Sequence, residues 1–390
     1  MSLKYSEGSH KMLYTSLAHK AALPLVLAAA TAIAATACGG GDGGSGRDAT
    51  IWRALSFNMY MGFDRDVFAG EVDFGNQEEL AAALQAAFDD FQKTDAAARI
   101  DGAAAEIAAL EPDVVGLQEA VSLILTKGTP DPSDDAPLIN YLGALLAAID
   151  LHGGPDYQAF VAINNTFEST LTLFESQQPF RFEEANVILV HPDFSGTEVG
   201  ALRYRTLLSI GNIPTDEGPR PYELVRGVQH VRAARNALTF ELFNTHLEIA
   251  GEAGQAAPVQ EAQAAELAQY VRSASAQAPG NPIVVLGDMN AVPGSTTHAT
   301  LLAAGWLDTF AVAGTGSSAT CCQQPDLTNE TSLATARIDY VFSSANGASA
   351  PPELSRSLLA MVERTLRSDG QGRIWLSDHF GALAEYRLSR

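Results

Sequence analysis

Cysteine, lysine and basic charge are all scarce in this sequence. The 390-residue chain has three cysteines, which are Cys38 and the adjacent pair Cys321 and Cys322. So few cysteines in an exported domain would exclude a fold held together by a disulfide framework. The pair leaves three states open: buried thiols, a disulfide between neighbours, or ligands of a soft metal. The last state needs further ligands, and none is evident in the segment around the pair, GTGSSATCCQQPD.

The shortage of basic residues bears on the partners of the protein. The chain has 24 basic and 46 acidic residues, a net charge of −22. Such a surface repels polyanions at long range, which disfavours tight binding to nucleic acid. It does not exclude a small phosphoester that is held by a metal ion.

Long apolar runs are missing except for LPLVLAAATAIAATA at residues 23–37. This run follows three lysines and is shorter than the roughly 20 residues that a spanning helix needs. A charged start, a short apolar run and small residues predict a secretory signal over residues 1–37. The run ends at Cys38, which resembles a lipoprotein processing site, although Ala35 replaces the usual aliphatic residue. The alternative is ordinary cleavage that leaves Cys38 as a spare thiol.

The segment after this signal is rich in glycine. Residues 38–49, which contain GGGDGGSG, are typical of a flexible tether. We therefore expect an exported lipoprotein, anchored to a membrane through lipid on Cys38 and facing the periplasm or the cell exterior. Removing residues 1–37 would leave 21 basic and 45 acidic residues, a net charge of −24.

The remaining residues, 50–390, are expected to form one domain. No internal repeat is apparent, which argues against a solenoid. Helical spacing predicts helices at residues 76–92, 94–113 and 259–277. Apolar runs predict strands at 50–60, 114–119, 157–163, 185–191, 283–290, 337–344 and 379–388, and a strand pair within 223–248. Because strands and helices mix without a strict βαβ rhythm, we expect a layered α/β domain with two sheets.

Polar side chains stand at the ends of many of these strands. A single Asp or Asn after a strand is more often part of a turn than of a site. Several polar and charged side chains gathered at one place are costly unless a cation or a substrate binds there. The ends are Asn58, Glu119, Asn244 with His246, Asp288 with Asn290, Asp339, and Asp378 with His379.

Six stretches carry a resemblance to a known family. In order they are SFNMY, VVGLQE, FNTHLE, LGDMNAVPGS, RIDYVF and LSDH. Together they resemble the motifs of the endonuclease/exonuclease/phosphatase superfamily, which includes DNase I-like nucleases. The resemblance implies a four-layered α/β sandwich, in which two mixed, mostly antiparallel sheets pack face to face with helices outside. It also implies hydrolysis of phosphoester bonds with Mg²⁺ or Mn²⁺.

The resemblance implies a metal site made of oxygen ligands. Glu119 would be the principal ligand, Asn58 would assist it, and Asp378 would contribute to the site. Independently, Mg²⁺ prefers carboxylate, amide and water oxygens and keeps several waters, so one or two carboxylates suffice.

The resemblance also implies catalytic roles around this metal. Asp288 would orient or deprotonate the attacking water, and Asn290 would hold a phosphate oxygen. His246 would hydrogen-bond the phosphoryl group. His379 would be the acid–base or transition-state-stabilising imidazole, held in position by Asp339. Asp339 could instead pair with the nearby Arg337.

Within this class the substrate stays open. We expect a metal-dependent phosphodiesterase, and the acidity, the tether and five phenylalanines near residues 160–182 narrowly favour a phospholipid or a small organic phosphodiester. The alternatives are an exported endonuclease and a non-catalytic surface-binding lipoprotein. We expect a monomer. Arg203, Arg205, Arg226, Arg232 and Arg235 could form a phosphate-facing patch, but their alternation along strands favours a solvated face.

Overall fold

The computed structural model describes residues 50–63, 76–125, 136–173, 178–213, 218, 220–250, 257–348 and 352–388. The predicted signal at residues 1–37 and tether at 38–49 lie outside these ranges, so both stay predictions. Within the described residues, no helix is long and apolar enough to cross a membrane.

The first large sheet has the strand order β14-β17-β1-β2-β5-β4, with β3 paired to β2. The pair β1–β2 is parallel and the other pairs are antiparallel. Its strands are β1 (Ile51–Asn58), β2 (Val114–Leu125), β3 (Ala136–Asn140), β4 (Gln158–Leu173), β5 (Gln178–Val190), β14 (Glu353–Ala360) and β17 (Gly381–Arg387).

The second large sheet has the order β12-β13-β11-β10-β9-β6. Here β10–β11 is the parallel pair. The strands are β6 (Ser195–Arg203), β9 (Gly227–Arg235), β10 (Leu238–His246), β11 (Ile283–Asp288), β12 (Leu307–Asp308) and β13 (Asp339–Ser344). Two small ribbons complete the strands: β7 (Leu208–Ile213) with β8 (Arg220–Leu224), and β15 (Arg364–Leu366) with β16 (Arg373–Trp375).

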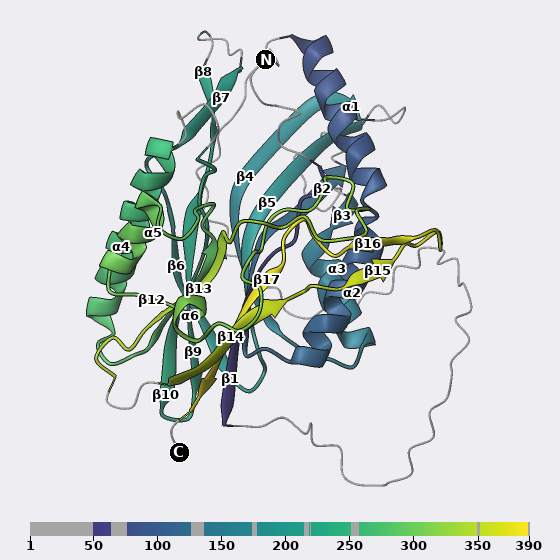
Figure 1. Ribbon diagram of the computed structural model, residues 1–390. Coiled ribbons are helices and arrows are strands. Elements are labelled where there is room, and N and C mark those ends of the chain that lie inside the picture. The colour runs from purple at the N-terminus through teal and green to yellow at the C-terminus, as the bar shows by residue number, and fades with distance from the viewer. Residues whose placement is uncertain are drawn as a thin grey trace, which may run out of the picture.

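All helices but the last lie outside the two large sheets, and the last packs between β13 and β14 at the edge of the sandwich (Figure 1). They are α1 (Gln77–Lys93), α2 (Ala96–Leu110), α3 (Tyr141–Leu151), α4 (Ala257–Gln277), α5 (Thr296–Ala303) and the short α6 (Thr309–Ala313). Side-chain oxygens cap most of their first turns; Asn76, for example, accepts from the amides of Glu78 and Glu79. One apolar core packs α2 and α3 on the first sheet, and another packs α4 and α5 on the second.

A third core lies between the two sheets. Its residues come from the inner faces of strands of both sheets, and Trp52 of β1 stacks on Phe240 of β10 with ring centroids 4.2 Å apart. The layers are therefore helix, sheet, sheet and helix. The predicted four-layered sandwich of two mixed, mostly antiparallel sheets is confirmed.

Two details differ from the sequence-based prediction. Strand β2 does not stop at Glu119 but continues to Leu125, past a register shift between Leu117 and Ala120. Helix α3 was not expected, because its sequence YLGALLAAIDL is almost entirely apolar and shows little helical alternation.

Candidate functional site

The strand directions bring the polar strand ends to one rim. In the first sheet, Asn58 ends β1, and Glu119 follows Gln118, the register partner of Asn58 in the parallel strand β2. In the second sheet, His246 and Asp288 are register partners at the ends of β10 and β11, and Asp339 is the partner of Asp288 at the start of antiparallel β13. Because antiparallel strands begin where their neighbours end, one rim collects all of these side chains.

Asn58 joins the two sheets at this rim. Its Nδ2 donates to Glu119 Oε1 at 3.0 Å and to Asp288 Oδ2 at 3.1 Å. Its Oδ1 accepts from the amide of Tyr60. Asn58 is 1% exposed, so these bonds are shielded from water. In this structure the amide therefore links two carboxylates through its NH₂ group, and direct metal ligation by its oxygen stays a prediction.

Glu119 is turned toward the rim by an irregularity in β2. Its φ of 55° lies in the left-handed region, and it falls in the register shift between β2 and β5. A bulge of this kind re-aims a side chain at the edge of a site. Glu119 Oε2 also accepts from the amide of Met61 at 2.7 Å. The carboxylate is thus fixed by two donors.

His379 belongs to the same cluster. Its Nδ1 lies 2.9 Å from Asp339 Oδ2 and 3.9 Å from Asp288 Oδ2. Its Nε2 lies 3.9 Å from Asp378 Oδ1. Burial opposes the charged imidazole, but the carboxylates of Asp339 and Asp378 raise the pKa of His379 well above its ordinary value. The ring therefore stays protonated at neutral pH.

Ser377, which precedes this pair, attaches the segment to β1. Its hydroxyl donates to the carbonyl of Asn58 at 2.7 Å and accepts from the amide of His379. No role was predicted for Ser377 from the sequence. The LSDH stretch is thus a fixed turn that holds Asp378 and His379 beside the end of β1.

The second imidazole, His246, is held by an arginine. Arg226 NH1 lies 2.9 Å from His246 Nδ1, and guanidinium groups only donate. Nδ1 therefore accepts, and Nε2 carries the proton of the neutral ring. Nε2 lies 3.5 Å from Asp288 Oδ2, an oxygen that can accept this proton. His246 can thus present a proton at the rim.

Asn290 follows Asp288 in a left-handed conformation, with φ 49°. Its backbone amide donates to Asp288 Oδ1 at 2.8 Å, and its side-chain NH₂ group donates to the carbonyl of Leu247. These contacts fix the Asp-x-Asn turn next to His246. The predicted contact of Asn290 with a phosphate oxygen stays a prediction.

For Arg226, the prediction of a solvated face was wrong. Its side chain is 3% exposed and lies between two buried carboxylates. NH1 donates to Glu184 Oε1 at 3.1 Å, and Nε forms an ion pair with Glu248 Oε2 at 3.5 Å. An available signal was the position of Arg226 directly before β9, the strand that pairs with the strand ending in His246.

Arg99 is a second buried arginine that sequence reasoning missed. It projects from α2, is 1% exposed, and donates to the carbonyls of Met59 and Thr94 and to the hydroxyl of Tyr141. It therefore fixes the chain just after Asn58. An arginine among the buried residues of an otherwise apolar helix stripe was the available signal.

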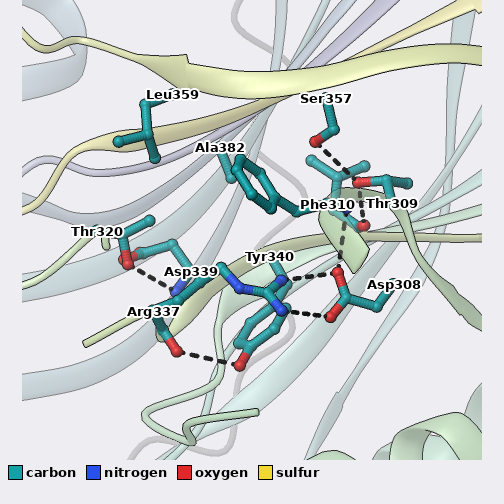
Figure 2. A pocket seen from close by; sticks show the side chains of 11 residues that line it. Asp308, Thr309, Phe310, Thr320, Arg337, Asp339, Tyr340, Ser357, Leu359 and Ala382 are labelled. Atoms are coloured by element: carbon teal, nitrogen blue, oxygen red, sulfur yellow. Dashed lines mark hydrogen bonds and ion pairs between the residues drawn. The ribbon is translucent and has the colours of Figure 1, made fainter. Parts of the chain in front are cut away.

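Figure 2 shows a small cavity behind Asp339. Arg337, the alternative partner for Asp339, instead makes two bonds of 2.7 Å to Asp308. The amide of Asp339 donates to the hydroxyl of Thr320, and its Oδ1 is buried without a hydrogen-bond partner. The cavity holds about 10 Å³, which is space for one water at most. Because Arg337 pairs with Asp308, the carboxylate of Asp339 pairs with His379 and not with Arg337.

The amino-acid pattern over this rim matches a known family. The profile of the Endonuclease/Exonuclease/phosphatase family matches residues 55–379. The chain belongs to this family. Members of the endonuclease/exonuclease/phosphatase family hydrolyse phosphoester bonds. A comparison with curated proteins gave no match.

Solved structures of this family share the fold. A family protein from Bacteroides thetaiotaomicron is 15% identical, with a TM-score of 0.53 over 87% of this chain and 96% of its own. A mannosyl-6-phosphatase from the same species is 16% identical, with a TM-score of 0.51 over 86% of this chain and 99% of its own. At these identities the likeness concerns the fold alone.

The carboxylate oxygens at this rim are ligands of the kind that a hard divalent cation prefers. Burial, and then the charge of Glu119, raises the pKa of Asp378 to about 6 against the opposing attraction of His379. Glu119 is therefore close enough to disfavour the charge of Asp378, and a cation held by both carboxylates would offset this repulsion. Glu119 and Asp378 would hold such an ion. The residues therefore fit Mg²⁺ or Mn²⁺, whose identity the donors leave open.

Proposed function

We propose that the protein is an exported, metal-dependent phosphodiesterase that acts on a small organic phosphodiester or a phospholipid. One observation carries the proposal: a single hydrogen-bonded cluster joins Glu119, Asn58 and Asp288, and a ring nitrogen of His379 lies 3.9 Å from Asp288. Oxygen ligands for a cation and an imidazole for proton transfer thus lie side by side at this rim.

The side chains divide the chemistry as follows. A divalent ion held by Glu119 and Asp378 would neutralise charge on the phosphoryl group. Asp288, fixed by Asn58, would orient the attacking water. His246 would donate from Nε2 to a phosphoryl oxygen. His379, charged beside Asp339, would donate to the oxygen on which negative charge develops.

Charge and packing bear on the substrate class. A net charge of −24 after removal of residues 1–37 opposes binding to a long polyanion. Of the five phenylalanines near residues 160–182, Phe167 and Phe174 lie outside the described side chains, and the other three give less support to a lipid than their sequence suggests. Phe180 is 2% exposed, Phe160 packs on the core between the sheets, and Phe182 packs against Phe63. The case for a phospholipid therefore rests on the predicted tether.

The test is hydrolysis of bis-p-nitrophenyl phosphate by the purified protein with Mg²⁺ or Mn²⁺, and again with EDTA. We expect release that needs the metal. Glu119→Gln protein, purified identically, corrects for contaminating phosphatases. Sphingomyelin and plasmid DNA in parallel separate the lipid and nuclease classes. A folded protein without any metal-dependent release would reject the enzyme and favour a binding module.

The export and the tether need their own measurement. We propose that Cys38 carries lipid and holds the domain outside the cytoplasm. Labelled palmitate should enter the wild-type protein in the native host but not the Cys38→Ser variant. Equal labelling of the two proteins would reject the tether, and size-exclusion chromatography of the detergent-free domain would test the expected monomer.

A further inference from the structure

The adjacent cysteines Cys321 and Cys322 lie against the residue that carries the catalytic imidazole. Cys321 forms isolated β-bridges with Ala336 on one side and with His379 on the other. It is 5% exposed, whereas Cys322 is exposed. The pair is therefore fixed beside His379 and is open to small reagents through Cys322.

The backbone on both sides of the cysteines is bonded to the backbone on both sides of His379. The amide of Phe380 donates to the carbonyl of Thr320 at 2.7 Å, and the amide of Gln323 donates to the carbonyl of Asp378 at 2.9 Å. This ladder keeps the two segments in register. The proximity of the sulfurs to the imidazole thus needs no loop movement.

The ligand atoms are close enough to share one ion. The Sγ atoms of Cys321 and Cys322 and a ring nitrogen of His379 all lie within 4.8 Å of one another. In a tetrahedral zinc site, metal bonds of about 2.0 to 2.3 Å place ligand atoms about 3.5 Å apart. In the reduced protein, rotation of the cysteine side chains can bring the three ligand atoms to these separations. The further ligand that the sequence around the pair lacked is supplied by a distant segment.

We propose that the reduced cysteine pair and His379 form an inhibitory site for a soft divalent cation such as Zn²⁺ or Cd²⁺. Thiolates select soft metals, whereas the oxygen ligands of Glu119 and Asp378 select hard ones. Because Asp339 holds Nδ1 of His379, Nε2 is the ring nitrogen for the metal. A carboxylate behind a ligating histidine is the usual arrangement at zinc sites.

The site depends on the oxidation state of the sulfurs. In this structure Cys321 and Cys322 form a disulfide. A disulfide has no thiolate to offer a metal. A phosphine reductant opens it: the sulfurs gain two electrons and two protons, and phosphorus takes oxygen from water to become phosphine oxide. The metal then binds both sulfurs and displaces the two thiol protons.

Occupation of this site has a consequence for catalysis, which rests on the proposed function. A metal on Nε2 removes the proton that His379 would donate to the phosphoester. The oxidised pair therefore keeps His379 available, and the reduced pair exposes it to capture by a soft metal.

Binding is tested first, without turnover. Cys38→Ser protein, which lacks the third thiol, is reduced with a phosphine, freed of it by gel filtration without oxygen, and titrated with Cd²⁺. We expect sulfur-to-cadmium absorption that saturates at one ion per chain, and no such band before reduction. Changing Cys322 to Ser in this background should weaken Cd²⁺ binding at least about tenfold. Loss of a residue that only hydrogen-bonds a metal ligand already costs about that much affinity, and loss of a ligand itself should cost no less.

Inhibition is tested second, each protein being compared with its own zinc-free activity. Zn²⁺ should inhibit the reduced Cys38→Ser enzyme at concentrations at least about tenfold below those that inhibit its oxidised form or the Cys322→Ser variant. Equal inhibition of all three would place the ion elsewhere and overturn the proposal, as would a reduced protein without the cadmium band. If no phosphoester is hydrolysed, the proposed function fails, but the cadmium titration still decides the site.

Discussion

Arg226 offers the sharpest test of how the rim is supported. Its guanidinium is 3% exposed and lies against Glu184 and Glu248, whose side chains are 6% and 0% exposed. Replacing Arg226 with Met keeps the volume of the apolar stem and removes the charge. Two buried carboxylates then lose the cation that offsets their loss of hydration.

The expected loss of stability follows from this burial. Removing one partner of a buried pair typically costs about 3 to 5 kcal/mol, because the remaining charge stays desolvated. An exposed pair is worth about 0 to 1 kcal/mol. Arg356, which is 54% exposed and bonds Glu385, is the matched surface control. We therefore expect Arg226→Met to destabilise by about 3 to 5 kcal/mol and Arg356→Ala by about 1 kcal/mol or less.

Urea unfolding followed by tryptophan fluorescence measures both variants. Trp52, Trp306 and Trp375 are all buried, so their emission reports loss of the core. Adding Glu184→Gln to Arg226→Met should recover part of the loss, because one of the two unpaired charges disappears. If Arg226→Met is not stable enough to purify, Arg226→Lys replaces it in the comparison and should still lose more stability than Arg356→Ala. Equal losses for Arg226→Met and Arg356→Ala would refute the reasoning.

Three further predictions concern the same rim. Glu119→Ala should raise the Mg²⁺ concentration for half-maximal activity more than about tenfold, measured by metal titration of hydrolysis, because a direct ligand is lost. His379→Ala should lower turnover by about 10²- to 10⁴-fold while half-activation by metal stays unchanged, and a shifted metal titration would contradict its acid–base role. Buried beside Arg226, Glu184 has a pKa lowered from 4.5 to about 2 even though burial opposes its charge. Its stabilisation is thus complete above pH 4.5 and is lost as pH falls toward 2, so unfolding of Glu184→Gln should depend less on pH in this range.

The arrangement of the rim could be predicted because it follows from strand ends. Each motif combines an apolar strand with a polar residue at one end, as in FNTHLE and LGDMN. Strand direction then decides where the polar residues meet. The parallel register of His246 with Asp288 and the antiparallel register of Asp288 with Asp339 realise this expectation.

The support of the rim could not be predicted, because it depends on pairings between distant segments. Arg226 and Glu184 are 42 residues apart, and neither position reveals that the other is its partner. The same holds for Cys321, whose partner His379 comes from another segment. Local pattern describes the face of a strand, but only the packed sheets determine which charge meets which.

The charges at the rim are the physical basis for the two cation effects that we propose. Asp288, Asp339 and Asp378 lie within 3.9 Å of one protonated ring, and Glu119 shares the amide of Asn58 with Asp288. Buried carboxylates are costly unless their charge is compensated. Compensation is incomplete, since the pKa of Asp378 is raised to about 6. A hard cation bound between Glu119 and Asp378 would supply the missing positive charge and leave His379 free to donate. A soft cation on the sulfurs would take the nitrogen of His379 instead. Under both proposals, the same imidazole would make the rim productive with one class of metal and inactive with the other.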